Sequence, residues 1–167
     1  MSNTENFTSW RREQTLIFLD KSTTGTSPSW VRIKMSTLLE IAVNPVTEEY
    51  AFIGYKDDIT LLDRYKISLS QENQAVEGDA CFDYLWGLFY SLPSGSEVQT
   101  DCLIVFPKAG TTDGSFQAWK FRATLVLNTF NGVDKKITYD IQAAGDVERG
   151  TVTVADGTPT FVAATGD

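Results

Sequence analysis

One stretch of this sequence has the periodicity of a helix, and it lies among segments that alternate as strands do. Over residues 79–92, apolar side chains recur at steps of three and four residues, and so share one helix face: Cys81, Tyr84, Leu85, Leu88, Phe89 and Leu92. Asp79 is placed to cap the start of this helix, and Pro93 with Gly95 ends it. A single apolar helix among strands has to pack on or beside a sheet.

Two large side chains of the predicted helix, Trp86 and Tyr90, fall outside this apolar face. The helix therefore carries more apolar surface than one sheet covers, and surplus apolar surface is typical of an interaction site. Trp86 and Tyr90 either complete the core of the domain or form an interface with another subunit.

Alternating polar and apolar residues predict antiparallel strands over much of the remaining chain. The pattern is longest over residues 116–130 and returns over 136–144, while residues 102–106 are continuously apolar, as in a strand buried on both faces. Shorter strand candidates lie at 15–19, 30–34, 38–43, 65–71, 151–154 and 160–163. Seven to nine strands and one helix predict a mainly β fold: an antiparallel β-sandwich or barrel of two packed sheets with one flanking α-helix.

The 167 residues are predicted to form a single domain. Residues 1–14 are expected to be a flexible N-terminal arm, and residues 155–167 a C-terminal strand or tail. The first residues lack the order of a signal peptide, so synthesis in a cytoplasm is expected. No apolar run approaches the roughly 18–20 residues that span a bilayer.

The connection at residues 44–64 is long and unusually apolar for a loop, because long loops normally run over the solvent surface. One interpretation is a strand pair that packs on the same core. The other is an arm that packs on a second subunit. The residues predicted for such an inter-subunit contact are Tyr50, Phe52, Ile53, Tyr55, Asp57, Asp58, Leu61 and Leu62.

The chain is acidic, with a net charge of −8, and the charge is uneven. Residues 1–70 hold eight basic and nine acidic side chains, whereas residues 71–167 hold six and thirteen. Binding to a phosphate backbone relies on clustered Lys and Arg, so this composition argues against it. A solvated acidic face is the simplest interpretation. Contact with DNA that must slide without adhering is also compatible with the charge.

Residues for catalysis are scarce. The chain has no histidine, which excludes Ser-His-Asp and Cys-His arrangements. The adjacent acids Glu48-Glu49 and Asp57-Asp58 point to opposite faces of an extended segment, whereas glycoside hydrolysis needs facing carboxylates. Cys81 and Cys102 are expected to be buried thiols, and without histidine they predict no metal site. We therefore predict a protein that is not an enzyme and needs no cofactor.

The order of these segments resembles that of phage tail tube proteins, the major tail proteins of long, non-contractile-tailed phages or related prophages. The resemblance covers about residues 30–154, and no single motif in it is diagnostic. It is carried by an N-P-x-T-E-E segment, a helix that leads into a P-S-G-S-E turn, and an A-G-D…G-T ending, at residues 44–49, 79–97 and 144–151.

This resemblance implies a tail-tube-like fold whose subunits form hexameric rings, stacked into a hollow tube. One sheet of each subunit would join its neighbours in a continuous inner β-barrel through which genomic DNA passes. The long arm of the family packs on neighbouring subunits and rings, and residues 44–64 occupy its place here. An acidic lumen would repel phosphate and keep DNA from adhering.

The partners implied by the resemblance are further copies of the chain, other tail proteins at the tube ends, and the tape measure protein in the lumen. DNA would pass through the lumen without being bound specifically, and no membrane partner is implied. The expected location is the tail of the virion, after synthesis in the cytoplasm of a bacterial host.

Two alternatives remain at this point. A tube subunit of a contractile tail or of a phage-derived bacteriocin would share the fold. A monomeric β-sandwich module that binds carbohydrate or protein would use exposed aromatic side chains, and the candidates for sugar platforms are Trp10, Trp30 and Trp86.

Overall fold

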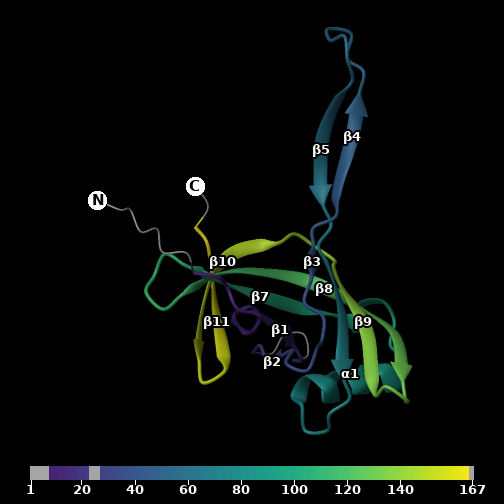
Figure 1. Cartoon of the computed structure of the whole chain (residues 1–167), viewed down its shortest axis with the longest axis vertical. Helices are drawn as coiled ribbons and strands as arrows, with labels where there is room; N and C mark the ends of the chain where they lie inside the picture. Colours follow the sequence, from purple (N-terminus) through teal and green to yellow (C-terminus); the bar gives the residue numbers. More distant parts are fainter. Residues whose placement is uncertain (1–7, 23–26, 166–167) are drawn as a thin grey trace.

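The structure is a computed structural model that describes residues 8–22 and 27–165. It contains a nine-stranded antiparallel sheet, a separate two-stranded sheet and, among the described residues, one α-helix (Figure 1). The strands are β1 Leu16–Asp20, β2 Trp30–Arg32, β3 Ile41–Ala42, β4 Pro45–Tyr50, β5 Ile59–Tyr65, β6 Ser68–Gln74, β7 Gln99–Ala109, β8 Phe116–Asn131, β9 Lys136–Ala143, β10 Glu148–Ala155 and β11 Thr158–Ala163. The helix is α1 Ala80–Ser91. The predicted mainly β class with one flanking helix is confirmed.

The long strand β8 connects two halves of the nine-stranded sheet. Its residues 116–124 pair with β7 on one edge, and residues 116–120 pair with β10 on the other. From residue 123 onward, the second edge pairs with β9 instead. One half of the sheet therefore holds β2, β1, β7, β10 and β11, and the other holds β9, β6 and β3. These halves correspond to the two packed sheets that the sequence predicts.

The core lies between the two halves and under the helix. Side chains from both halves and from α1 form one buried cluster, which includes Ile104 from β7, Tyr139 from β9 and Leu85 from α1. A smaller cluster lies on the opposite face of β7, where Leu103 and Val105 pack with Val152 of β10. Because β7 contributes alternate residues to both clusters, it is buried on both faces, as the apolar run at 102–106 predicts.

The helix begins and ends close to where its sequence predicts. The Asp79 carboxylate accepts a hydrogen bond of 3.2 Å from the backbone N–H of Phe82, which is an N-cap. Leu92 ends the helix in a left-handed conformation, with its N–H donating to the carbonyl of Leu88. Cys81, Phe82 and Leu85 are the buried residues of the helix. No helix in the described ranges is long and apolar enough to cross a membrane.

The segment that follows β2 passes from one half of the sheet to the other. Ile33 donates a backbone hydrogen bond to Ile17 in β1, and Thr37 then donates one to Glu72 in β6. Farther along, Ile41 pairs with Leu69 of β6. The chain therefore crosses a seam between β1 and β6, which makes the body of the protein barrel-like.

Several predicted boundaries differ from those observed. Regular pairing within residues 38–43 is confined to Ile41–Ala42, and the predicted strand at 65–71 is divided between the end of β5 and the start of β6. Of the predicted N-terminal arm, residues 1–7 lie outside the described residues, and Arg12–Gln14 form a short 3₁₀ helix. Of the predicted C-terminal strand or tail, β11 is a strand, and residues 166–167 lie outside the described residues.

Candidate functional site: the projecting arm

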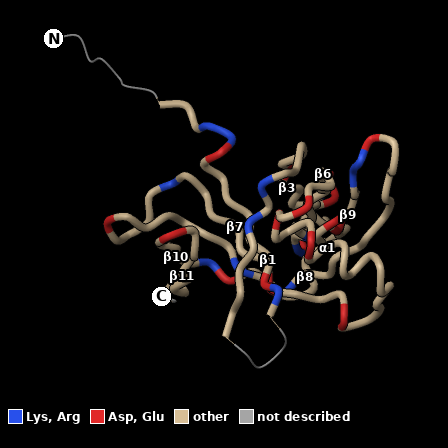
Figure 2. Tube along the Cα trace, turned by 90° about the horizontal axis from the view of Figure 1, so that it is seen from below, with Lys and Arg blue, Asp and Glu red and all other residues tan. Residues whose placement is uncertain are grey.

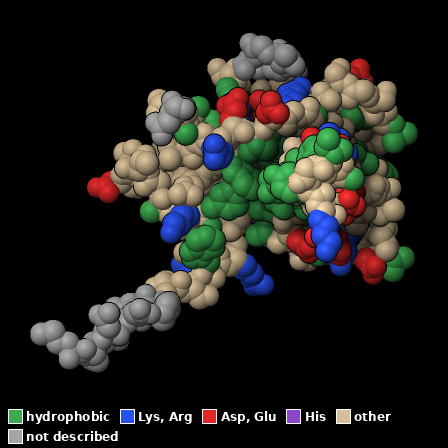
Figure 3. Space-filling view, turned by 90° about the horizontal axis from the view of Figure 1, so that it is seen from above, with side chains coloured by type: hydrophobic (Ala, Val, Ile, Leu, Met, Phe, Trp, Pro, Cys, Tyr) green, Lys and Arg blue, Asp and Glu red, His purple; other side chains and the backbone are tan. Residues whose placement is uncertain are grey.

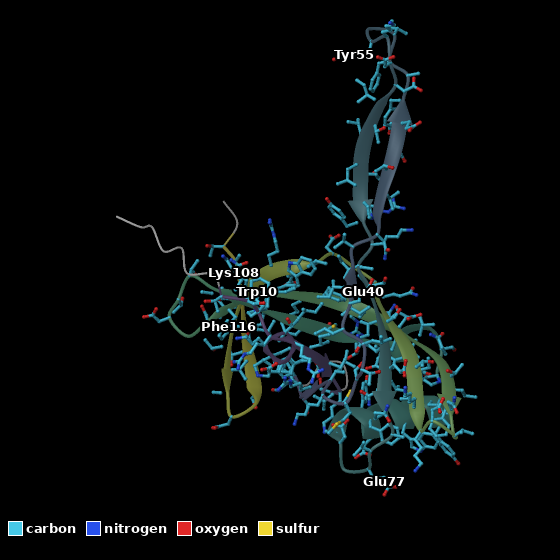
Figure 4. All side chains as sticks on the ribbon, viewed as in Figure 1. Trp10, Glu40, Tyr55, Glu77, Lys108 and Phe116 are labelled. Carbon is cyan, nitrogen blue, oxygen red and sulfur yellow. The ribbon has the colours of Figure 1, made fainter. Side chains whose placement is uncertain are left out.

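The β4–β5 hairpin projects from the body as a separate two-stranded sheet, which we call the arm (Figure 1). Its register runs from Pro45 opposite Tyr65 to Tyr50 opposite Ile59, with an irregularity between Val46 and Thr47. Figure 4 places Glu40 near the base of the arm and Tyr55 at its far end. The segment is a strand pair, as the first interpretation predicts, but its side chains belong to neither buried cluster of the body. That it packs on a second subunit, as the second interpretation has it, stays a prediction.

The predicted contact residues of the arm are largely exposed. Ile53 is fully open to solvent, Tyr55 is 65% exposed, and Leu61 and Leu62 are each 48% exposed. Tyr50 and Phe52 are also exposed large side chains, and both acidic residues Asp57 and Asp58 are exposed. Exposed apolar side chains gathered on one thin hairpin are unusual for a monomer and typical of an interaction surface. That they contact another subunit stays a prediction.

Aromatic side chains pack on one another at the tip of the arm, residues 51–58, and at Tyr50 directly before it. The rings of Tyr50 and Phe52 stack with centroids 5.4 Å apart, and Tyr55 meets Phe52 edge to face at 6.5 Å. The Tyr50 hydroxyl donates a hydrogen bond to the Glu48 carboxylate, which raises the pKa of Tyr50 above its usual value. The tip therefore presents a shaped apolar surface flanked by carboxylates.

An elbow at Asn44 sets the direction in which the arm leaves the body. Asn44 has a φ of 42°, in the left-handed region that Asn tolerates better than most residues. Its side-chain amide donates to the carbonyl of Lys66 at 3.0 Å and to the hydroxyl of Ser68 at 2.8 Å. The backbone N–H of Lys66 also donates to the carbonyl of Val43. This role of Asn44 was not predicted from the sequence, although its place directly before Pro45 signals a break between strands.

A second exposed apolar surface surrounds the helix residues Trp86 and Tyr90. Trp86 stacks on Phe89 at 5.6 Å and meets Phe130 of β8 edge to face at 5.4 Å, yet it stays 39% exposed. Tyr90 is 80% exposed. Trp86 thus partly completes the packing of the helix on β8, whereas Tyr90 adds nothing to the core. The contribution of Phe130 was not apparent from the sequence, because it is distant from the helix along the chain.

The half of the sheet formed by β3, β6, β9 and the second half of β8 has free strand edges. β3 pairs only with β6, and β8 pairs with β7 no farther than Thr124. In the described part of the chain, no strand pairs with the other side of β3 or with that edge of β8 beyond residue 124. Free edges of this kind are ready sites for pairing with another chain.

Charged residues are distributed unequally between the regions. Figure 2 shows both acidic and basic positions in the part of the view that contains β3, β6 and β9, and Figure 3 shows hydrophobic side chains gathered on the side from which the arm projects. On the outer face of β6 and β9, Glu72 and Asp140 are only partly buried, and Lys136 forms an ion pair with Glu72. The outer face of this half-sheet is therefore polar, in contrast to the apolar tip of the arm.

The paired acids do not form an arrangement suited to catalysis. Glu48 and Glu49 follow one another along β4, opposite Leu61 and Thr60, so their side chains point to opposite faces of the arm. Within residues 8–22 and 27–165, no three Cys, Asp or Glu side chains are grouped as metal ligands. Both thiols are free and buried, as predicted, and burial raises the pKa of Cys81 to about 12.

The tryptophans proposed as sugar platforms have different environments. Trp10 is 59% exposed, but Trp30 is partly buried against the cluster around Leu103 and Val105. Trp86 packs on the aromatic side chains of the helix and β8. The prediction that all three are exposed platforms is therefore wrong for Trp30.

Two solved structures have a similar fold. A chain from the tail of an empty GTA particle, determined by helical refinement with C6 symmetry, matches with a TM-score of 0.55 and 14% identity. The match covers 83% of this chain and 97% of that chain. A chain from the six-fold symmetrised baseplate of the anti-feeding prophage (AFP) matches with a TM-score of 0.50 and 8% identity, over 86% of this chain and 97% of that one.

The two matches identify the fold as tail-tube-like, and at these identities they establish the fold alone. Comparisons of the sequence with protein-family profiles and with curated proteins gave no match.

Proposed function

We propose that this chain is a structural subunit of a phage-type tail, and that its copies form stacked hexameric rings around a hollow tube that delivers DNA. The observation that carries this proposal is the arm, whose apolar tip has no partner surface within reach on its own body (Figures 1 and 4). Burying that tip requires another molecule. The two similar folds come from six-fold assemblies, which supports the same mode of assembly for this chain.

The free strand edges support closure of a ring. The outer edge of β3 and the free edge of the second half of β8 lie at opposite sides of one half-sheet. Pairing one with the other on the next copy is a heterologous contact, which generates a ring when the rotation closes. Six such contacts would join the half-sheets into a continuous inner barrel, which leaves no open edge to aggregate.

The outer face of the same half-sheet is suited to lining a lumen. The other half-sheet has its second face covered by β10 and β11, with Val152 and Phe161 packed over β7. The face of β6 and β9 instead presents Asp140, Glu72 in its ion pair with Lys136, and neutral polar side chains. Carboxylates here would repel the phosphates of DNA, so that DNA slides through without specific binding. In this role the protein is a structural component and not an enzyme.

Electron microscopy of the purified full-length protein tests the proposal. Negatively stained samples over a series of concentrations should contain rings or tubes about 100 Å wide, as estimated for six domains of this size around a pore. Sedimentation velocity on the same samples should show a hexamer or larger species. A monomer at every concentration, with no ring in the images, would contradict the proposed function.

A tube subunit of a contractile tail or of a phage-derived bacteriocin is the second candidate, because such a subunit would share this fold. The two candidates differ in what surrounds the tube. Particles isolated with this chain should show a bare tube if the tail is non-contractile. A second protein layer that shortens around the tube would favour the contractile alternative.

A further inference from the structure

A cavity opens at the seam of the body, between β1 with β2 on one side and β6 on the other. We call it the seam cavity; its volume is about 630 Å³. Ile17 and Ile33 form part of its apolar wall, and Leu38 and Leu39 line it while remaining more than 40% exposed. The cavity thus offers a hydrophobic surface that the protein's own side chains leave partly uncovered.

Basic side chains line the seam cavity in a protein that is otherwise acidic. Arg12, Arg32 and Lys34 lie around it, with Glu13 as the one acidic lining residue. The whole chain has fourteen basic and twenty-two acidic residues, so this excess of positive charge is local. A ligand with both apolar and acidic groups would complement this surface.

A buried side chain in the seam cavity has unused hydrogen-bonding groups. Gln71 is only 2% exposed, and neither the nitrogen nor the oxygen of its amide has a hydrogen-bond partner. The Nε of Arg32, which lines the same cavity, is also buried without a partner. Such groups are costly to leave unpaired, because they lose hydration without gaining a protein partner. An inserted peptide segment would supply both a carbonyl acceptor and an N–H donor.

We propose that the seam cavity receives the tip of the arm, residues 51–58, from a second copy of the chain. The tip combines Phe52, Ile53 and Tyr55 with the acidic pair Asp57 and Asp58, and Lys56 leaves it a net charge of −1. The arm as a whole, residues 45–65, has five acidic and two basic residues, so its charge is opposite to that of the cavity lining. The tip therefore matches the cavity in apolar character, in charge and in main-chain groups.

Docking of the tip has to occur between copies. The tip lies at the far end of a hairpin that points away from β1 and β2, so it does not reach the cavity of its own chain (Figures 1 and 4). When one copy's tip binds in the cavity of a second copy, the tip of the second copy is still free to bind a third. Such a contact is head-to-tail and can propagate through many copies. This inference rests on the proposed function and names the surface that the arm would contact.

A charge exchange tests the pairing of tip and cavity. R12E/K34E and D57K/D58K should each weaken self-association about tenfold or more, measured by sedimentation velocity, because opposed charges become like charges. Combining all four changes should restore most of the association. Arg12, Lys34, Asp57 and Asp58 are exposed, so the folded body should be unaffected.

The matched control is K108E/R149E, which makes the same change of charge at two exposed residues outside the cavity lining. This control should associate more strongly than R12E/K34E. Equal weakening by both double variants, or no recovery when the four changes are combined, would overturn the docking proposal.

A photo-crosslinker in place of Phe52 distinguishes docking from assembly in general. Crosslinks from the full-length protein, in any multimer that it forms, should map to the cavity lining of another copy, within residues 12–17 and 32–39 or at Gln71. Rings whose crosslinks map to the surface of Trp86 and Tyr90 instead would overturn docking but not the proposed function. Dimers crosslinked at the cavity lining without rings would support docking and contradict the tube, and a protein that never self-associates would contradict both.

Discussion

The consecutive strands β5 and β6 are each seven residues long, and the Asn44 elbow bonds to the link between them. Leu69 of β6 is fully buried, whereas Leu61 and Leu62 of β5 are each 48% exposed. Leucine side chains fewer than ten residues apart are therefore half exposed in one strand and fully buried in the next. β6 is stabilised by the core of its own chain, but nothing in the described body covers β5. This difference is the one expected if, as proposed, the arm's apolar residues serve contacts between molecules while those of the body serve folding.

Removing the arm should have the largest effect on assembly and little effect on the body. Replacing residues 48–62 with a short turn should abolish rings and tubes in electron micrographs. The shortened protein should keep its cooperative thermal unfolding, because none of the removed side chains belongs to the two buried clusters. A shortened protein that is unfolded would show that the arm is part of the core.

A matched pair of Leu→Ala substitutions should show that the body contributes more than the arm to the free energy of unfolding. Leu85→Ala in the helix should lower the free energy of unfolding by about 2–5 kcal/mol, since it leaves a cavity at a fully buried site. Leu61→Ala in the arm should lower it by less than about 1 kcal/mol, because its side chain is half exposed. Chemical denaturation of the unassembled protein measures both, and equal losses would contradict the division between the regions.

Asp20 should make the body sensitive to acid. Burial disfavours its charged form, but hydrogen bonds from the Ser22 side chain and from the backbone amides of Ser29 and Ser22 outweigh burial and lower the pKa of this carboxyl. Its stabilising contribution is therefore present above the unfolded-state pKa of about 3.9 and is lost as the pH falls through the lower folded value.

Asp20→Asn should cost about 1–2 kcal/mol near neutral pH, because its amide hydrogen bonds lose their charge assistance. The variant should also lack the loss of stability at low pH that protonation of Asp20 causes in the wild type. The control Asp57→Asn, at an exposed position on the arm, should cost less than about 1 kcal/mol near neutral pH. A variant of Asp20 with the wild-type loss of stability in acid would contradict the assignment.

A local effect on stability is expected at the elbow between the two regions. Asn44→Ala places an alanine at a φ of 42°, which costs about 1 kcal/mol, and it also removes the side-chain hydrogen bonds to Lys66 and Ser68. Asn44→Gly loses the same bonds but tolerates the backbone conformation. Thermal unfolding should rank wild type first, Gly second and Ala last. An alanine variant as stable as the glycine variant would show that the elbow is unstrained.

The sequence predicted well those features that depend on local pattern. The helix at 79–92, its Asp79 cap and the alternation of β8 and β9 arise from neighbouring residues. The direction of the arm was not predictable, because alternating strands suit both a core and a free hairpin. Its elbow depends on bonds from Asn44 to residues more than twenty positions away. The seam cavity was likewise not predictable from the sequence, because residues from β1, β2 and β6, far apart in the chain, line it together.

Thiol reactivity can test most directly whether assembly buries the arm. The two native thiols are buried, and the raised pKa of Cys81 leaves little thiolate near pH 8, so neither should react with a thiol reagent in the folded protein. The variant I53C adds a thiol at a fully exposed site on the tip. In the unassembled protein this thiol should react at the rate of a free cysteine. In assembled rings or tubes its reaction should slow by about tenfold or more, because the tip is covered; an equal rate in both states would contradict the proposed role of the arm.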